Sequence, residues 1–226
     1  MASLLLLDLD NTLADREAAF LAWARARAVE WAPADVDAVA YLVEHDDDGI
    51  RPRREFLAAV SEHFGLRRPV EELVADYRRE VRRALPAVPD AVLERLTVLR
   101  TEGWKVAVVT NGEADVQSAT VDQLGLRTLL DACCISGELG IRKPDPRIFE
   151  AAAARCGETL THACMVGDGE VDVLGADAAG IASIWLHRGR TWRRTDIEPD
   201  RIADGLMEAL SPAMLAACST RSAVEP

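Results

Sequence analysis

The stretch LLLLDLDNTLADRE, residues 4–17, begins with four leucines and runs directly into two aspartates, Asp8 and Asp10. Four consecutive apolar residues predict a strand that is buried on both faces of a sheet. Because side chains at i and i+2 of an extended strand point to the same side, both carboxylates are expected to face one place at the strand's carboxyl end. Open α/β sheets bind their ligands at that edge. The stretch therefore predicts a central strand that ends in a ligand site.

Short apolar segments and helical patterns alternate through most of the remaining chain. Further strands are expected at residues 104–110, 132–136, 163–167 and 181–186. Helices are expected at residues 89–101, 113–124, 146–156 and 171–179. This alternation predicts an α/β fold with a doubly wound parallel sheet, a Rossmann-like core. Beyond about Leu210 the periodicity is lost, and the chain is expected to fray there.

Residues 15–85 interrupt the alternation, because they carry helical periodicity and no convincing strand. Asp15 is expected to cap a first helix, and Pro52 and Pro69 are expected to start two later ones. The sequence thus predicts a core domain formed by residues 1–14 and 86–226. An all-helical domain is expected to be inserted in it at residues 15–85.

Composition excludes several classes of protein. The 226 residues carry a net charge of −12, which argues against a nucleic-acid partner. The N-terminal apolar run is too short for a signal peptide or a membrane span, so no membrane association is expected. The five cysteines form no CxxC pair and predict neither a disulfide framework nor structural zinc. A cytoplasmic protein fits these features best, as either a monomer or a homodimer.

Polar residues gather where the expected parallel strands end. They are Asp8 and Asp10, then Thr110, Asn111 and Gly112, then Lys143, and finally Asp168 and Asp172. Four carboxylates at one edge repel one another, so a hard divalent cation, Mg²⁺ above all, is expected among them. Lys143 adds a positive charge, and the residues around Thr110 supply donors for phosphate oxygens near a helix N-terminus. The set favours phosphoryl transfer from a small-molecule phosphate ester.

With these motifs the chain resembles the haloacid dehalogenase superfamily of hydrolases. The matching motifs are DLDNT (residues 8–12), TNG (110–112), KPDP (143–146) and GDGEVD (167–172), in the order that the family has them. The helical insertion resembles the type 1 cap of subfamily I phosphatases in that superfamily. One departure is Gly169, where the family often has Ser or Thr.

The resemblance implies a role for each matching residue. Asp8 would be the nucleophile that forms an aspartyl-phosphate, and Asp10 would be the general acid and base. Thr110, Asn111 and Gly112 would bind the substrate phosphate, together with Lys143. Mg²⁺ would be held by Asp8, the backbone carbonyl of Asp10 and Asp168, and Asp172 would support it.

Several activities share this family and its motifs. The resemblance is strongest to phosphatases of nucleotides and acylneuraminate 9-phosphate, with phosphoglycolate phosphatases as close relatives. A phosphomutase and a 2-haloacid dehalogenase are alternatives, although dehalogenases usually lack an acid at the position of Asp10. A non-catalytic phosphate-sensing module is the alternative from a different class.

Arg53 and Arg54 are unusual because they stand in the first turn of an expected helix, where the macrodipole disfavours cations. They follow the polar run EHDDDG, residues 44–49. We expect an arginine from this segment to take part in substrate selection.

Overall fold

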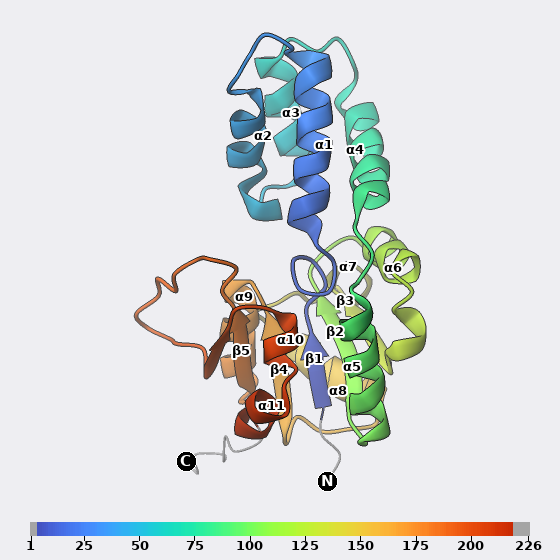
Figure 1. Ribbon diagram of the computed structural model, residues 1–226, viewed down its shortest axis with the longest axis vertical. Coiled ribbons are helices and arrows are strands. Elements are labelled where there is room, and N and C mark those ends of the chain that lie inside the picture. Colours follow the sequence, from blue (N-terminus) through green and yellow to red (C-terminus); the bar gives the residue numbers. More distant parts are fainter. Residues whose placement is uncertain (1–3, 219–226) are drawn as a thin grey trace. The chain divides into compact units, whose positions relative to one another are not determined.

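The computed structural model describes residues 4–218, which fold into two compact units (Figure 1). The first unit comprises the described residues up to Ala14 and those from Ala87 onward, and the second comprises Asp15–Pro86. Over the described part of the chain, no helix has the length and apolar character that a membrane span requires.

The first unit is built on a six-stranded parallel sheet. In spatial order its strands are β3 (Ala132–Ile135), β2 (Lys105–Thr110), β1 (Leu4–Leu7), β4 (Ala163–Gly167), β5 (Ala182–Leu186) and β6 (Arg201–Ala203). β1 is central, and its last residue, Leu7, lies opposite Val108 of β2 and Val166 of β4. All four leucines of β1 are buried, so both faces of the sheet are covered. The predicted doubly wound parallel sheet is confirmed.

Helices connect the strands and cover the sheet. They are α5 (Asp90–Thr101), α6 (Ala114–Gln123), η2 (Arg127–Leu129), α7 (Ser136–Leu139), α8 (Arg147–Cys156), α9 (Glu170–Ala178), α10 (Leu206–Ala209) and α11 (Pro212–Cys218). Alternate side chains of β1 face opposite sides, and on one side Leu4 and Leu6 pack with Phe149 of α8 and Ala176 of α9. This packing fixes β1 in register, so its carboxyl end delivers Asp8 at a defined place.

Five elements of the first unit were not predicted from the sequence: the short helices η2, α7 and α10, the strand β6 and the helix α11. The strand β6 was not predicted, because three residues with one buried side chain give no alternating pattern. Residues 212–218 were expected to fray, but they form α11, which starts at Pro212 directly after Ser211. The Ser211 hydroxyl accepts a hydrogen bond from the Met214 amide at 3.4 Å, and proline is favoured at a first helical position. Residues 219–226 lie outside the described residues.

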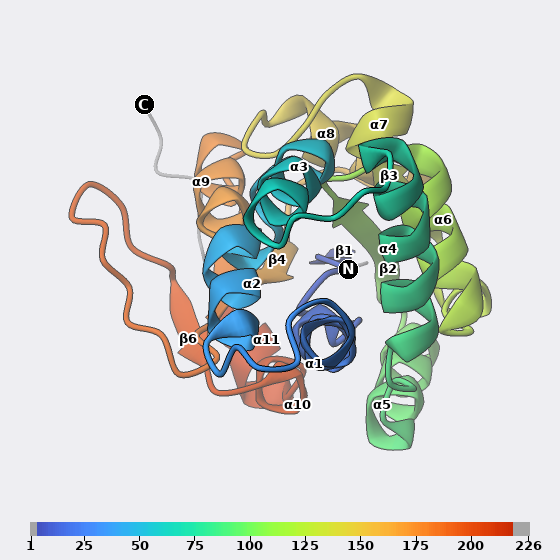
Figure 2. The same cartoon turned by 90° about the horizontal axis from the view of Figure 1, so that it is seen from above.

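The second unit consists of helices, and none of its residues 15–86 forms a strand. They are α1 (Arg16–Trp31), α2 (Ala38–Asp46), η1 (Asp47–Gly49), α3 (Arg53–His63) and α4 (Val70–Ala84). Asp15 caps α1 as predicted, because its carboxylate accepts a hydrogen bond from the Ala18 amide at 3.0 Å. The four α-helices pack in a ring in which each contacts two others, and Figure 2 shows α1 nearly end-on. Aromatic side chains fill the space between them, with the Trp23 and Tyr77 ring centroids 4.9 Å apart.

Candidate active site

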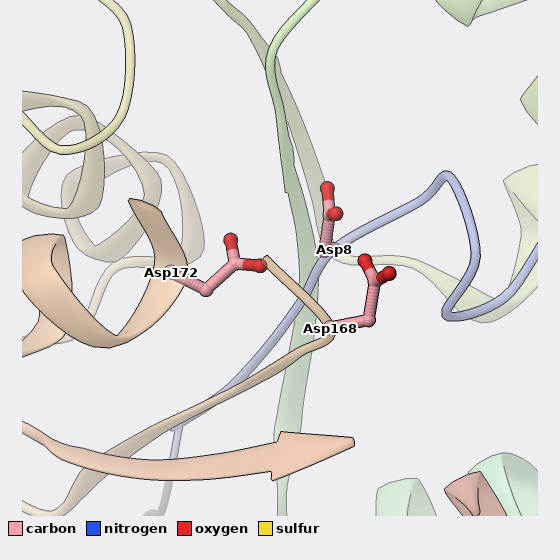
Figure 3. A group of neighbouring side chains, drawn as sticks. All are labelled: Asp8, Asp168 and Asp172. Atoms are coloured by element: carbon pink, nitrogen blue, oxygen red, sulfur yellow. The ribbon is translucent and has the colours of Figure 1, made fainter. Parts of the chain in front are cut away.

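Three buried aspartates meet at the carboxyl edge of the sheet in the first unit. Asp8 directly follows β1, Asp168 directly follows β4, and Asp172 stands in the first turn of α9 (Figure 3). One carboxylate oxygen from each lies within 4.8 Å of the other two. The β1–β4 pairing continues past Leu7, because the Asp8 amide donates to the Val166 carbonyl at 2.9 Å. The sheet itself therefore places Asp8 beside the end of β4.

Lys143 lies between two of these carboxylates. Its Nζ donates to Asp8 Oδ1 at 2.7 Å and to Asp172 Oδ1 at 2.6 Å, and the residue is only 2% exposed. Asn111 holds the Lys143 backbone from both sides: its Nδ2 donates to the Lys143 carbonyl at 3.0 Å, and its Oδ1 accepts from the Lys143 amide at 2.9 Å. The side chain of Asn111 thus positions the lysine.

Electrostatics at this edge are dominated by burial and mutual repulsion. Burial raises the pKa of Asp172 to about 7, with Lys143 opposing the rise and Asp8 adding to it. Burial and then the nearby Asp8 raise the pKa of Asp168. Burial alone would lower the pKa of Lys143, but Asp172 and Asp8 hold it above its ordinary value. A cluster of this kind favours additional positive charge among the carboxylates.

The donor set suits a hard divalent cation. Three carboxylates supply oxygen ligands at mutual distances that one ion can bridge, and these are the ligands that Mg²⁺ prefers. The Asp172 carboxylate packs directly against the backbone of Gly167. A Cβ atom at residue 167 would lie only 2.2 Å from Asp172 Oδ2, so the glycine makes room for the carboxylate. The same oxygen accepts from the Gly169 amide at 3.0 Å, which orients the carboxylate without a side chain at that position. The three carboxylates therefore fit a site for one divalent cation.

Asp10 has a different environment from Asp8. It does not belong to the cluster of three aspartates, and its Oδ2 accepts a hydrogen bond from Gln117 Nε2 at 2.9 Å. The same amide nitrogen lies 2.9 Å from the Thr110 hydroxyl, so Gln117 joins Asp10 to the end of β2. Gln117 is 4% exposed and was not identified from the sequence. The one feature of the sequence that could have identified Gln117 is its position in the first turns of the helix that follows TNG.

The predicted phosphate-binding residues lie at the end of β2. Thr110 is buried, and its hydroxyl accepts the hydrogen bond from Gln117. The Gly112 amide donates to the Ser136 hydroxyl at 3.0 Å. Phosphate binding by Thr110, Asn111 and Gly112 stays a prediction, and the structure adds that Asn111 and Gly112 also tie the loop to neighbouring segments.

Two arginines beyond β5 were also missed. Arg188 Nη1 and Arg190 Nη2 each donate to Asp168 Oδ2 at 2.9 Å, and Arg190 Nη2 also donates to the Asp168 carbonyl at 2.6 Å. The indole of Trp185 donates to the same carbonyl at 2.8 Å. Both arginines come shortly after a predicted strand, at the edge of the sheet where the other site residues gather. That position in the sequence could have identified them as site residues.

Arg53 and Arg54 have partners within the second unit. Arg53 pairs with the buried carboxylate of Asp46, and its Nη2 donates to the Gly49 carbonyl at 2.5 Å. Arg54 pairs with Glu71 at 3.0 Å, and both of these side chains are exposed. The Asp46 carboxylate therefore compensates for the unfavourable position of a cationic side chain, Arg53, at a helix N-terminus. Substrate selection by either arginine stays a prediction.

Comparison with known proteins agrees with this geometry. The haloacid dehalogenase-like hydrolase family model matches residues 2–180. The chain is 36% identical over 196 residues to phosphoserine phosphatase of Thermus thermophilus, covering 84% of this chain and 77% of that protein. It is 35% identical over 104 residues to (S)-2-haloacid dehalogenase 4A of Burkholderia cepacia, covering 46% and 45%.

A solved structure shows the same fold. The HAD-hydrolase YfnB from Bacillus subtilis, bound to magnesium, superimposes with a TM-score of 0.73 at 22% identity, covering 92% of this chain and 96% of that one. The family match spans both the strand that carries Asp8 and the motif that carries Asp168 and Asp172. The chain therefore belongs to the haloacid dehalogenase-like hydrolases.

Proposed function

We propose that this protein is a Mg²⁺-dependent phosphatase that hydrolyses phosphomonoesters of small metabolites through an aspartyl-phosphate on Asp8. The observation that carries the proposal is the contrast between Asp8 and Asp10. Asp8 is buried beside Lys143, Asp168 and Asp172, whereas Asp10 lies outside that cluster and is held by the neutral amide of Gln117. Two carboxylates in such different environments suit two different roles.

Asp8 is suited to attack phosphorus. The Lys143 contact to Oδ1 fixes the orientation of its carboxylate and places a positive charge where the transferred phosphoryl group would carry negative charge. Attack forms the bond between an Asp8 oxygen and phosphorus and breaks the bond from phosphorus to the leaving oxygen.

Asp10 is suited to move protons. In the first half-reaction it donates a proton to the leaving alkoxide, and in the second it takes one from the water that attacks the aspartyl-phosphate. That attack breaks the bond between Asp8 and phosphorus, which releases inorganic phosphate and restores the Asp8 carboxylate and the protonated Asp10. Gln117 positions Asp10 for both transfers.

Asp8, Asp168 and the Asp10 backbone carbonyl would hold Mg²⁺, with Asp172 supporting them beside Lys143. When bound, Mg²⁺ supplies positive charge that offsets the carboxylates and stabilises charge on the phosphoryl oxygens. We further propose that residues 1–14 and 86–226 form the catalytic core and that residues 15–85 serve as its cap.

Hydrolysis of p-nitrophenyl phosphate and of a panel of metabolite phosphates tests the proposal, with Mg²⁺ or EDTA present. Asp8→Asn should abolish activity, and the matched control Asp115→Asn, on the exposed start of α6, should keep it. Calorimetric titration with Mg²⁺ should show binding that Asp168→Asn weakens at least tenfold. Activity that survives EDTA or persists in Asp8→Asn would contradict the mechanism.

The similarity to (S)-2-haloacid dehalogenase 4A favours dehalogenation as the second candidate. That reaction needs an aspartate nucleophile and no metal, and it leaves Asp10 without a role. Halide release from 2-chloropropionate in EDTA, without phosphatase activity, would favour it over the phosphatase.

A further inference from the structure

The segment that follows β5 is strongly basic in an acidic chain. Residues 187–194 read HRGRTWRR and contain four arginines and no acid, while the whole chain carries a net charge of −12. The segment lies beyond residue 180, where the match to the family model ends.

These residues form a pocket of about 470 Å³ in the first unit, next to the candidate metal site. Asp168 lies in the wall of the pocket and also belongs to the cluster with Asp8 and Asp172. The side chains that matter for recognition are Asp168, Glu170, Trp185, Arg190, Trp192 and Arg193. The pocket and the candidate metal site therefore share Asp168, so the pocket adjoins the place where a ligand of Asp8 would bind.

Two tryptophans give the pocket a fixed wall. Trp185 is buried, and Trp192 packs against it edge to face, with ring centroids 5.1 Å apart. The Trp192 indole donates to the Ile197 carbonyl at 2.8 Å, which ties the loop to its own later part. The Arg190 guanidinium lies over the Trp185 ring, 5.9 Å from its centroid. The loop is therefore preorganised rather than dependent on a ligand for its shape.

The acids in the pocket wall already have cationic partners. Asp168 accepts from Arg188 and Arg190, and Glu170 lies 3.8 Å from Arg194. Arg193 is exposed at the pocket, and within residues 4–218 no carboxylate pairs with it. The pocket therefore presents one guanidinium whose charge is not offset by a side chain, and a guanidinium binds carboxylate or phosphate with two parallel hydrogen bonds.

We propose that this pocket binds a second anionic group, a carboxylate or a phosphate, carried on the leaving group of the substrate, and that Arg193 pairs with it. This inference rests on the proposed phosphatase function. It narrows the substrate class to phosphomonoesters whose leaving group bears a negative charge. Neutral sugar or polyol phosphates would leave Arg193 without a partner.

Substrate pairs that differ only in this charge test the inference. The carboxylate pair is 6-phosphogluconate against sorbitol 6-phosphate, and the phosphate pair is fructose 1,6-bisphosphate against fructose 6-phosphate. For each enzyme variant the readout is the ratio of kcat/KM within a pair, because a general loss of activity cancels in that ratio. The variants are Arg193→Gln, Arg193→Lys and, as matched control, Arg127→Gln, whose parent side chain is exposed, pairs with Asp122 at 2.8 Å and does not line the pocket.

In at least one pair the wild type should prefer the more anionic member about tenfold, the value of one charge-assisted contact. Arg193→Gln should remove that preference, Arg193→Lys should restore part of it, and Arg127→Gln should leave it unchanged. Equal ratios in wild type and Arg193→Gln, or an equal fall in Arg127→Gln, would overturn the inference while phosphatase activity remains. If neither these esters nor p-nitrophenyl phosphate are hydrolysed, the proposed function fails and the inference with it.

Discussion

Replacing Lys143 with methionine should destabilise the first unit and make its stability depend on Mg²⁺. The lysine Nζ contacts Asp8 and Asp172 at 2.7 and 2.6 Å, and the side chain is almost fully buried. At an effective dielectric constant of about 20, each contact corresponds to roughly 6 kcal/mol of Coulomb attraction, much of which desolvation offsets. Removing one partner of a buried ion pair typically costs about 3–5 kcal/mol. We expect a loss of that size for Lys143→Met in EDTA.

Hydrogen exchange measures this loss in the unit that holds the site. Amides of β1 and β4 report its opening free energy, and amides of α1, in the second unit, serve as the internal control. The double variant Lys143→Met/Asp172→Asn should recover roughly half of the loss, because it removes one of the carboxylates left unpaired. Saturating Mg²⁺ should raise the stability of Lys143→Met more than that of the wild type. A loss below about 1 kcal/mol, or no recovery in the double variant, would refute the electrostatic reasoning.

Three further changes test individual contacts. Gln117→Met should lower kcat about tenfold with unchanged Mg²⁺ affinity, because it removes the hydrogen bond that positions Asp10 and leaves the three carboxylates of the metal cluster in place; a loss of Mg²⁺ binding would contradict this role. Asp46→Asn should cost the second unit about 3 kcal/mol in urea denaturation, since the buried Arg16 and the partly buried Arg53 lose their counter-charge. Burial raises the pKa of Asp131, but hydrogen bonds from a β2 amide and a lysine bring it below its ordinary value. That stabilisation is full above the ordinary carboxyl pKa and is lost as pH falls through the lowered value, so Asp131→Asn should lower Tm by more at pH 7 than at pH 3.

The sequence was sufficient to predict five of the six strands and the place of Asp8 and Asp168 at the edge of the sheet, because both depend on local patterns. Four leucines that end in Asp8 and Asp10 define a buried strand with acids at its carboxyl end, and parallel strands place such ends together. The same logic placed Asp168 beside Asp8, and the structure brings their oxygens within 4.8 Å of each other.

Contacts that depend on side-chain reach across loops could not be predicted. Gln117 contacts Asp10 across 107 positions of sequence, and nothing in a helical glutamine marks it for that role. Arg188 and Arg190 reach Asp168 because the chain turns back after β5, and the path of that turn is not encoded in a local pattern. Arg53 seemed out of place at a helix start because the sequence did not reveal its buried partner, Asp46, which lies at the end of α2.

The central claim is that the Asp8 carboxylate forms a covalent bond to the phosphoryl group of the substrate. Rapid quenching during turnover, followed by borohydride reduction, converts an aspartyl-phosphate to homoserine at the modified position. Peptide mass spectrometry should then find homoserine at residue 8, only when both substrate and Mg²⁺ are present, and none at residue 10. Turnover that leaves residue 8 unmodified under these conditions, or modification at another residue, would contradict the account.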